Sequence, residues 1–316
     1  MAAKNWVTPL IWARRGSQAA FLLFYLYLFG ETVFHAGNRG AVAGGFFFDI
    51  DPLVTLALWL GGHPVRAAML WSVLTAILTV VCGRWFCGWV CPFGTVHTFF
   101  SSLRRVRNKE KLKVDAWSPW QRVKYYVLIA VLIGAVAGMN LAGWLDPFSF
   151  LTRSMSSAVY PAFNAGVQGA FDWIYRHDVA IGPWHVAAVT EPVYAWLRYH
   201  VLSVGQPRYL GATLIGILFG VVIALNFYRY RFWCRYICPL GALLGCMGRT
   251  PLVRLWIHQG ECHDCRACVL DCHGACDPES ERTWRAPECY YCMNCLPRCP
   301  TVAMTFGSRR PAGWES

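Results

Sequence analysis

The sequence predicts an all-α polytopic membrane protein, with four transmembrane helices arranged as two parallel repeats, followed by a small α+β domain. Three observations predict this fold class. The 316 residues are 56% hydrophobic and only 15% charged, a composition typical of membrane proteins. Long apolar runs recur along the chain and an eleven-residue frame occurs twice. Finally, regularly spaced cysteines gather near the end of the chain.

The apolar runs are the predicted membrane spans. They lie at residues 19–34, 67–81, 125–145 and 210–227. The runs at 125–145 and 210–227 have about the 20 residues that a helix needs to cross a bilayer, and the run at 67–81 is expected to continue into residues 82–92. A shorter run at residues 53–60 cannot cross a hydrocarbon core about 30 Å thick, so it predicts an interfacial or re-entrant helix.

The distribution of basic residues predicts the orientation of these spans. The net charge is +12, but the cations stand in short loops between apolar runs, which favours a membrane protein over a nucleic-acid-binding protein. Residues 103–124 alone hold eight of them: Arg104, Arg105, Arg107, Lys109, Lys111, Lys113, Arg122 and Lys124. We therefore expect a bacterial cytoplasmic (inner) membrane protein with both termini cytoplasmic, and a long periplasmic loop at residues 149–207.

Two cysteine runs dominate the C-terminal region. Each has the spacing C-x2-C-x2-C-x3-C, at residues 262–272 and 289–299, and Pro300 follows the second. In bacterial two-cluster ferredoxins, three cysteines of such a run ligate one [4Fe-4S] cluster and the fourth ligates the other. The spacing therefore predicts a 2[4Fe-4S] ferredoxin-like domain at residues 251–316. One cluster is assigned to Cys262, Cys265, Cys268 and Cys299, and the other to Cys289, Cys292, Cys295 and Cys272.

The first run departs from the pattern at its last position. His273 stands where a proline follows Cys299 in the second run, and a further cysteine, Cys276, lies four residues after Cys272. The fourth ligand of the cluster held by Cys289, Cys292 and Cys295 is therefore either Cys272 or Cys276. Zinc is an alternative metal, because paired C-x2-C units also form zinc sites. Three cysteines in successive C-x2-C steps, twice, favour iron–sulfur clusters.

The eleven-residue frame indicates an internal repeat. RWFCGWVCPFG at residues 84–94 aligns without a gap on RFWCRYICPLG at residues 231–241, and an Asp-Pro pair precedes each, at Asp51 and Asp146. Two crossings in each unit predict parallel repeats related by a pseudo-twofold axis along the membrane normal. The expected domains are a first repeat at residues 1–105, a basic loop at 106–124, a second repeat at 125–250 and the cysteine-rich domain at 251–316.

Each repeat carries the sequence C-x3-C-P. Cysteines four apart share one face of a helix, and the pseudo-twofold axis brings the two pairs to one place. They are candidate ligands of a third metal or redox centre, and iron–sulfur, copper(I) and a dithiol are all open. The alternative is that they are packed thiols, as we expect for Cys82 and Cys246. The four candidates are Cys87, Cys91, Cys234 and Cys238.

The C-x3-C-P pairs, the apolar runs and the two ferredoxin-type motifs together resemble the NapH/MauN family of ferredoxin-type membrane proteins, which is related to the membrane portion of NosR and to the copper-reducing CcoG proteins. The resemblance covers residues 15–305. It implies an electron-transfer subunit rather than a stand-alone enzyme, acting between the quinone pool or a cytoplasmic donor and a periplasmic or membrane redox partner. The implied partners are membrane lipid and other redox subunits, such as a ferredoxin-type protein, a multihaem cytochrome or a periplasmic reductase.

We expect outer-sphere transfer of single electrons, with no catalytic residue in the usual sense. A bound quinone is a possible further cofactor. The alternative function is a copper-reducing or metal-centre assembly factor of the CcoG kind, which would use the C-x3-C-P cysteines to bind copper. A channel or transporter is disfavoured because the apolar runs lack charged residues at mid-depth.

Overall fold

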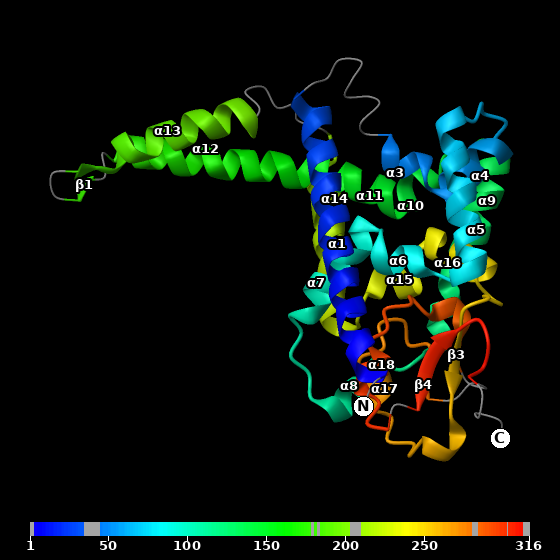
Figure 1. Cartoon of the computed structure of the whole chain (residues 1–316). Helices are drawn as coiled ribbons and strands as arrows, with labels where there is room; N and C mark the ends of the chain where they lie inside the picture. The colour runs from blue at the N-terminus through cyan, green and yellow to red at the C-terminus, as the bar shows by residue number, and fades with distance from the viewer. Residues whose placement is uncertain are drawn as a thin grey trace. The chain divides into compact units, whose positions relative to one another are not determined.

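The structure, a computed structural model, describes residues 3–34, 45–177, 180–181, 184–202, 210–279, 284–301 and 303–311. The described part is mostly helical, with two small antiparallel sheets (Figure 1). Contacts within the chain divide it into two compact units. The first comprises residues 1–25, 46–149 and 222–316, and the second comprises residues 26–45 and 150–221.

The first unit contains the cysteine-bearing segments. Its inner helices pack on one another: α16 contacts α9, α5 and α4, and α4 contacts α9. The elements with all their residues in this unit are α3 (Phe46–Asp49), α4 (Pro52–Leu60), η1 (Ala67–Leu70), α5 (Trp71–Cys82), α6 (Trp85–Trp89), α7 (Pro92–Ser102), α8 (Asn108–Val114), η2 (Pro119–Arg122), α9 (Val123–Val136), α10 (Ala142–Leu145), α15 (Phe232–Tyr236), α16 (Pro239–Met247), β3 (Arg254–Ile257), η4 (Gln259–Glu261), α17 (Ala267–Leu270), η5 (Ala286–Glu288), α18 (Cys295–Arg298) and β4 (Met304–Gly307).

Three helices have residues in both units: α1 (Ala3–Phe34), α11 (Pro147–Ser154) and α14 (Ala212–Tyr228). The second unit holds η3 (Met155–Val159), α12 (Tyr160–Arg176), β1 (Ala180–Ile181), β2 (Trp184–His185) and α13 (Val186–His200). Helices α12 and α13 pack together, with the rings of Phe171 and Tyr194 4.5 Å apart. Much of the segment expected to be a long loop is therefore helical. Its residues 178–179, 182–183 and 203–207 lie outside the described residues.

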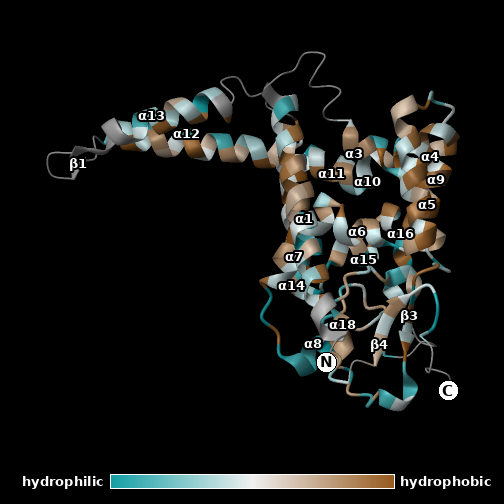
Figure 2. Cartoon of the chain, in the orientation of Figure 1, coloured by the Kyte–Doolittle hydropathy of each residue, from teal (hydrophilic) through white to brown (hydrophobic). Residues whose placement is uncertain are grey.

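The structure contradicts the predicted membrane spans. In the part of the chain that the structure describes, no helix combines the length and the apolar character needed to cross a bilayer. The prediction of four transmembrane helices in a multi-pass protein of the bacterial inner membrane, with both termini cytoplasmic, is therefore wrong. Figure 2 shows that α5 and α9 are mostly hydrophobic, whereas α8 is hydrophilic. Although α5 and α9 are apolar, they have only 12 and 14 residues.

Local features limit the length or the apolar character of the helices. The run at residues 67–81 begins as the short helix η1, which leaves α5 with 12 residues. Helix α9 has 14 residues and ends at Val136, with Ala137 as its C-cap and Gly138 next at a φ of 76°. Helix α14 has 17 residues. Helix α1 is 32 residues long but contains Pro9 and carries charged residues, among them Arg14 and Arg15.

The repeat has the same local architecture in each half: a short helix, a break and a second helix. Cys87 lies within α6 and Cys234 within α15. Cys91 and Cys238, by contrast, are the N-caps of α7 and α16, where each Sγ accepts a hydrogen bond from the glycine amide three residues on, at 3.3 and 3.2 Å. The proline of each C-x3-C-P motif thus begins a helix, at the position where proline is best tolerated. The expectation that the two cysteines of a motif share one face of a continuous helix is therefore wrong, because a break separates them.

Strands β3 and β4 flank the two cysteine runs in the sequence and pair antiparallel, with Leu255 opposite Phe306. Leu255, Ile257 and Met304 are buried in its core together with several of the cysteines. Helices α17 and α18 lie between these strands in the sequence and contact each other. The sheet therefore joins the segment before the first cysteine run to the segment after the second.

Candidate metal centres

The eight cysteines of the two runs separate into two cavities. The first is lined by cysteines from both runs, namely Cys262, Cys265, Cys268 and Cys299, with Pro300 beside them. The Sγ of Cys262 lies 3.8 Å from Oδ1 of Asp264, and the Sγ of Cys299 lies 3.6 Å from the hydroxyl of Thr301. Burial raises the pKa of Cys268 to about 12 when no metal is bound.

The second cavity has the reciprocal composition. It is lined by Cys289, Cys292 and Cys295 of the second run and by Cys272 of the first, with Cys276 as a fifth cysteine. Cys289, Cys292 and Cys295 are buried. Each cavity thus takes three cysteines from one run and the last cysteine of the other.

The backbone has the same unusual conformation in both runs. Asp264 and Tyr291, each two residues after the first cysteine of a run, have φ values of 48° and 50°. Arg266 and Met293, each four residues after that cysteine, have φ values of 55° and 57°. Side chains other than glycine rarely adopt this left-handed region, and such residues concentrate at functional sites. The two loops therefore curl in the same way, each presenting three thiols to the space it encloses.

Cys272 and Cys276 have distinct environments. Cys272 accepts a hydrogen bond from the backbone N–H of Cys276, and the two sulfur atoms are 3.3 Å apart. Hydrogen bonds from Cys276 lower the pKa of Cys272 to about 7, whereas the same sulfur contact and burial raise the pKa of Cys276. Cys272 is therefore the more readily ionised thiol, and a thiolate is the form that binds a metal.

His273, which replaces the expected proline, is buried and holds its segment in place. Its Nε2 accepts hydrogen bonds from Asn294, at 2.8 Å, and from the hydroxyl of Tyr230, at 3.1 Å, and its ring stacks on that of Tyr230. Burial and the nearby cation of Arg14 lower the pKa of His273 well below its usual value. The imidazole is therefore neutral and acts as an acceptor that ties the end of one run to Asn294 in the other.

The C-x3-C-P cysteines form another group of thiols. All four are buried, with at most 8% of each residue exposed: Cys87, Cys91, Cys234 and Cys238. Burial raises the pKa of Cys91 and of Cys238 first, and the charges of neighbouring cysteines raise both further: Cys87 and Cys234 act on Cys91, and the other three act on Cys238. The two halves of the repeat therefore bring their cysteine pairs to one region of the first unit.

Two buried arginines flank this region. Arg84 and Arg231 open the two repeat frames, and their guanidinium carbons each lie 4.8 Å from the ring centre of Tyr290. Arg231 donates from Nη2 to the carbonyl of Gly94 at 2.7 Å and from Nε to Thr98 at 2.8 Å. Arg84 donates to the carbonyl of Pro287 at 2.7 Å. The sequence analysis missed these residues, although both arginines stand at equivalent positions of the repeat.

The cysteine-rich region packs tightly against the repeat. A side chain at Gly88 would place its Cβ only 2.2 Å from the carbonyl oxygen of Tyr290. Trp89 donates from its indole nitrogen to the carbonyl of Tyr291 at 3.0 Å. Next to this contact, Glu288 pairs with Lys124 and lies 3.4 Å from Arg84, and all three are buried. Residues 287–291 therefore connect the two parts of the first unit.

Asp51 and Asp146 form a second repeat-related pair. Both are fully buried and sit at the starts of α4 and α11. Oδ1 of Asp51 accepts from the amide of Leu53 at 2.7 Å, and Oδ2 of Asp146 accepts from the amides of Phe148 and Ser149 at 3.0 and 2.9 Å. Burial, then the neighbouring carboxyl of Asp146, raise the pKa of Asp51 well above its usual value, and burial also raises that of Asp146.

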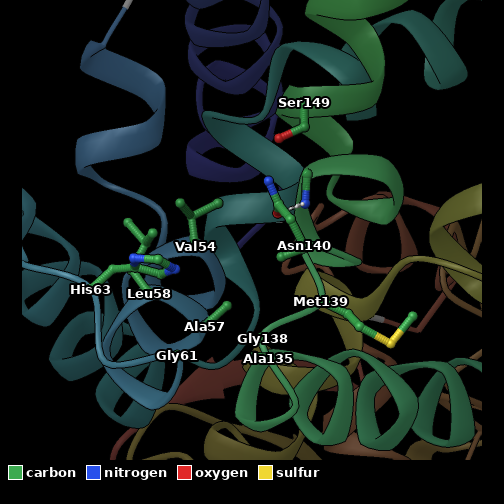
Figure 3. Close-up of a pocket in the computed structure, with 12 residues that line it drawn as sticks. Val54, Ala57, Leu58, Gly61, His63, Ala135, Gly138, Met139, Asn140 and Ser149 are labelled. Carbon is green, nitrogen blue, oxygen red and sulfur yellow. Dashed lines mark hydrogen bonds between the residues drawn. The ribbon is translucent and has the colours of Figure 1, made fainter.

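A cavity of about 230 Å³ lies next to this carboxyl pair. Figure 3 shows His63 on one side of the cavity and Asn140 and Ser149 on another. Val54 and Ser149 line it, and their amides donate to Asp51 and Asp146 respectively. The remaining lining residues are mostly apolar: Ala57, Leu58, Gly61, Ala135, Gly138, Met139, Ala142 and Gly143.

Among the described residues, no three side chains of histidine, cysteine, aspartate or glutamate converge closely enough to hold a single metal ion. A cluster of several irons makes a different demand, because its thiolates bind separate irons and stand around the cluster. The cavities described above have that arrangement, with thiols on different sides of a common space.

The two interleaved cysteine runs have the spacing found in ferredoxin-type proteins. The family described as "4Fe-4S binding domain" matches residues 67–110 and 211–258, the segments that contain the C-x3-C-P motifs. No solved structure matches the chain.

Curated relatives agree with this class. The ferredoxin-type protein NapH of Haemophilus influenzae is 26% identical over 95% of this chain and 90% of its own length. NapH of Escherichia coli is 24% identical over 99% of this chain and 95% of its own length. The methylamine utilization ferredoxin-type protein MauN of Methylorubrum extorquens is 26% identical over 70% of this chain and 59% of its own length. The chain is therefore homologous to the NapH and MauN ferredoxin-type proteins and contains a 4Fe-4S binding domain in two segments.

Proposed function

We propose that this chain is an electron-transfer protein that carries two [4Fe-4S] clusters and passes single electrons between a donor and a redox partner. One cluster would be held by Cys262, Cys265, Cys268 and Cys299, and the other by Cys289, Cys292, Cys295 and Cys272. The observation that carries this proposal is the reciprocal composition of the two cavities. That exchange of the fourth cysteine is the ligand pattern of bacterial two-cluster ferredoxins.

The residues around the cavities have defined roles in this proposal. When bound, a [4Fe-4S] cluster supplies a site that takes up and releases one electron. Cys276 donates to Cys272 and thereby favours its thiolate form. His273 fixes the end of the first run against Asn294. Arg14 donates to Asn294 at 3.3 Å and places a positive charge near Cys292. These contacts hold the thiolates in place and stabilise negative charge on them.

Single-cysteine variants test the interleaving. The purified chain should lose one of its two ferredoxin-type [4Fe-4S] signals in Cys299→Ser, and the lost signal should be the one lost in Cys265→Ser, although Cys299 belongs to the second run. Cys82→Ser is the matched control, because Cys82 lies outside both cavities, and it should leave both signals intact. If Cys299→Ser removed the signal that Cys292→Ser removes, the assignment would be wrong.

The C-x3-C-P cysteines are the proposed ligands of a third metal–sulfur centre. This proposal is supported by the match of the 4Fe-4S binding domain to the two segments that contain them and by the burial of all four thiols in one region. A third centre would lie on the far side of Tyr290 from Cys289, since Tyr290 contacts the repeat through Arg84 and Arg231. Electrons could then move between the repeat and the cysteine-rich region across residues 287–291.

A quinone-class donor is the second proposal for this protein, and the cavity beside Asp51 and Asp146 favours it. Its volume, just below that of typical ligand pockets, suits one substituted ring. Oxidation of a hydroquinone to a quinone releases two electrons and two protons. Val54 and Ser149 line the cavity and their amides donate to Asp51 and Asp146, so the carboxyl pair lies behind the cavity wall. His63 is in the lining itself and would be the first acceptor of a proton from a ring hydroxyl, with the second proton released to solvent.

Filling the cavity tests the second proposal. Ala57→Leu adds three carbons to the cavity wall and should weaken binding of a short-chain ubiquinone analogue at least tenfold, as measured by fluorescence quenching. Ala57→Ser leaves the volume almost unchanged and serves as the control. Equal binding by both variants would exclude this cavity as the donor site and would leave the two-cluster proposal untouched.

A further inference from the structure

We infer that Arg84 and Arg231 are paired counter-charges for an anionic metal–sulfur centre held by Cys87, Cys91, Cys234 and Cys238. The inference rests on the proposed third centre and goes beyond it by assigning the residues that set its charge balance and its potential.

The first argument is an imbalance of charge. Arg84, Arg231 and Lys124 are all fully buried. Arg84 and Lys124 share a single carboxylate, Glu288. Among the described residues Arg231 has no salt-bridge partner. Within this group, three cations and one anion leave a local surplus of two positive charges. Burying an unpaired charge is costly even after relaxation, so the site is expected to hold a matching anion.

The ring of Tyr290 is not a sufficient partner for this surplus. A cation above an aromatic ring gains less free energy than the burial of one charge costs. The hydroxyl of Tyr290 is itself buried and has no hydrogen-bond partner among the described residues. The contacts of Arg84 and Arg231 with the ring of Tyr290 therefore order the two guanidinium groups without neutralising them.

The second argument is the set of unused donors. Nε and Nη2 of Arg84 and Nη1 of Arg231 are buried and have no hydrogen-bond partner in the described part of the chain. Buried donors in proteins are nearly always satisfied, so each such atom calls for a partner. Sulfur atoms of a thiolate-ligated cluster accept hydrogen bonds from nearby donors, and such bonds help to set its reduction potential.

The third argument is the direction in which the arginines reach. Each guanidinium lies against the equivalent glycine of the opposite half of the repeat. A Cβ added to Gly241 would lie 2.6 Å from Nη2 of Arg84 and 3.4 Å from the Sγ of Cys238. A Cβ added to Gly94 would lie 3.0 Å from Nη2 of Arg231. The two arginines are thus exchanged between the halves, and each reaches the cysteine-bearing turn of the other.

The backbone at Arg231 points the same way. Arg231 has a φ of 51°, in the left-handed region that few residues other than glycine adopt. A conformation of this kind is strained and persists where the surrounding structure requires it. The hydroxyl of Ser101 accepts a hydrogen bond from the backbone N–H of Arg231, at 3.0 Å. From this position Nη2 of Arg231 reaches the carbonyl of Gly94, at 2.7 Å.

A cluster held by four thiolates supplies the missing charge, because an oxidised cluster of this kind carries roughly two negative charges and a reduced one carries more. Positive charge nearby stabilises the more negative, reduced form. Removal of either arginine charge should therefore lower the reduction potential of this centre alone.

The test uses the anaerobically purified whole chain, with potentiometric titration followed by electron paramagnetic resonance. The signal of the third centre is first identified as the one lost in the quadruple serine variant, which combines Cys87→Ser, Cys91→Ser, Cys234→Ser and Cys238→Ser. Arg84→Gln and Arg231→Gln should each lower its reduced-to-oxidised ratio at fixed potential about tenfold, a shift of about 59 mV for one electron. Arg84→Lys and Arg231→Lys should keep the potential close to that of the unaltered protein, because they keep the positive charge.

Two controls separate this role from a structural one. Arg84→Lys keeps the positive charge, so a shift equal to that of Arg84→Gln would overturn the inference. Arg266→Gln removes an exposed cation that pairs with Glu279, and it should move no signal of the third centre.

Stability provides a second readout, which serves if the glutamine variants assemble poorly. In the quadruple serine background the arginine charges lack their counter-charge, so Arg84→Gln should stabilise the chain to heat there and destabilise the unaltered protein. An equal effect in both backgrounds would refute the coupling. If the quadruple variant lost neither iron nor any signal, the third centre would be refuted while the two-cluster proposal would stand.

Discussion

The carboxyl groups of Asp51 and Asp146 meet in the interior of the first unit, where each side chain is fully buried. Oδ2 of Asp51 and Oδ1 of Asp146 accept no N–H or O–H hydrogen bond from the other described residues. Two carboxylates are both acceptors, so a hydrogen bond between them requires a proton on one. We therefore expect the pair to share a proton, as carboxyl pairs at close approach do.

This shared proton makes stability depend on pH in a defined direction. Both folded pKa values are raised above the ordinary value of 3.8, by burial first and, for Asp51, by the neighbouring carboxyl. A raised carboxyl pKa contributes stability that is fully present below the unfolded pKa and is lost as pH rises through the folded pKa. Urea unfolding should therefore show a free energy of unfolding that falls as pH rises above 3.8.

Asp51→Asn tests this origin. Asparagine keeps the N-cap and supplies an N–H donor toward Asp146 without a titrating proton. The variant should flatten the pH dependence, and Asp146→Asn should do the same. A slope unchanged in both variants would show that other groups cause it.

The fourth ligand of the second cavity is decided by a pair of substitutions. Cys272→Ala should abolish one of the two ferredoxin-type signals, because Cys272 has the lowered pKa and the required spacing. Cys276→Ser keeps a donor beside Cys272 and should retain both signals, with about the same iron content. Iron analysis and electron paramagnetic resonance give the answer, and the reverse pattern would move the ligand to Cys276.

The close contact between Gly88 and Tyr290 predicts a strong effect of one methyl group. Gly88→Ala would place its Cβ 2.2 Å from a backbone oxygen that cannot swing away, so it should destabilise the chain by about 1–3 kcal/mol or more. Gly16→Ala is the matched control: Gly16 is also helical, and nothing lies within 4 Å of an added Cβ. Thermal unfolding should separate the two variants, and an equal melting temperature would show that residues 287–291 do not pack here as described.

The sequence allowed some features to be predicted because they depend on local spacing. The cysteine sets written from the C-x2-C-x2-C-x3-C rule are the sets that line the two cavities, with Cys276 added to one; that iron fills them stays a prediction. The alignment of residues 84–94 on 231–241 likewise identified a frame that has the same helix–break–helix form in both halves.

Features that depend on where a helix breaks were not predictable from apolar runs. Hydropathy at residues 125–145 gave no sign that α9 ends at Val136, near the left-handed Gly138. The roles of Arg84 and Tyr290 were also hidden, because a buried cation is recognised by what surrounds it and not by its own sequence position. The proton shared by Asp51 and Asp146 required the two Asp-Pro turns to meet in space.

The central claim is that the chain holds two [4Fe-4S] clusters, and iron and acid-labile sulfide per folded chain test it most directly. Anaerobically purified protein should contain at least about eight irons and eight sulfides, and reduction should produce two interacting [4Fe-4S] signals. The third centre would raise the count toward twelve and would be removed by the quadruple serine variant. Zinc in place of iron, or about four irons with a single signal, would contradict the account.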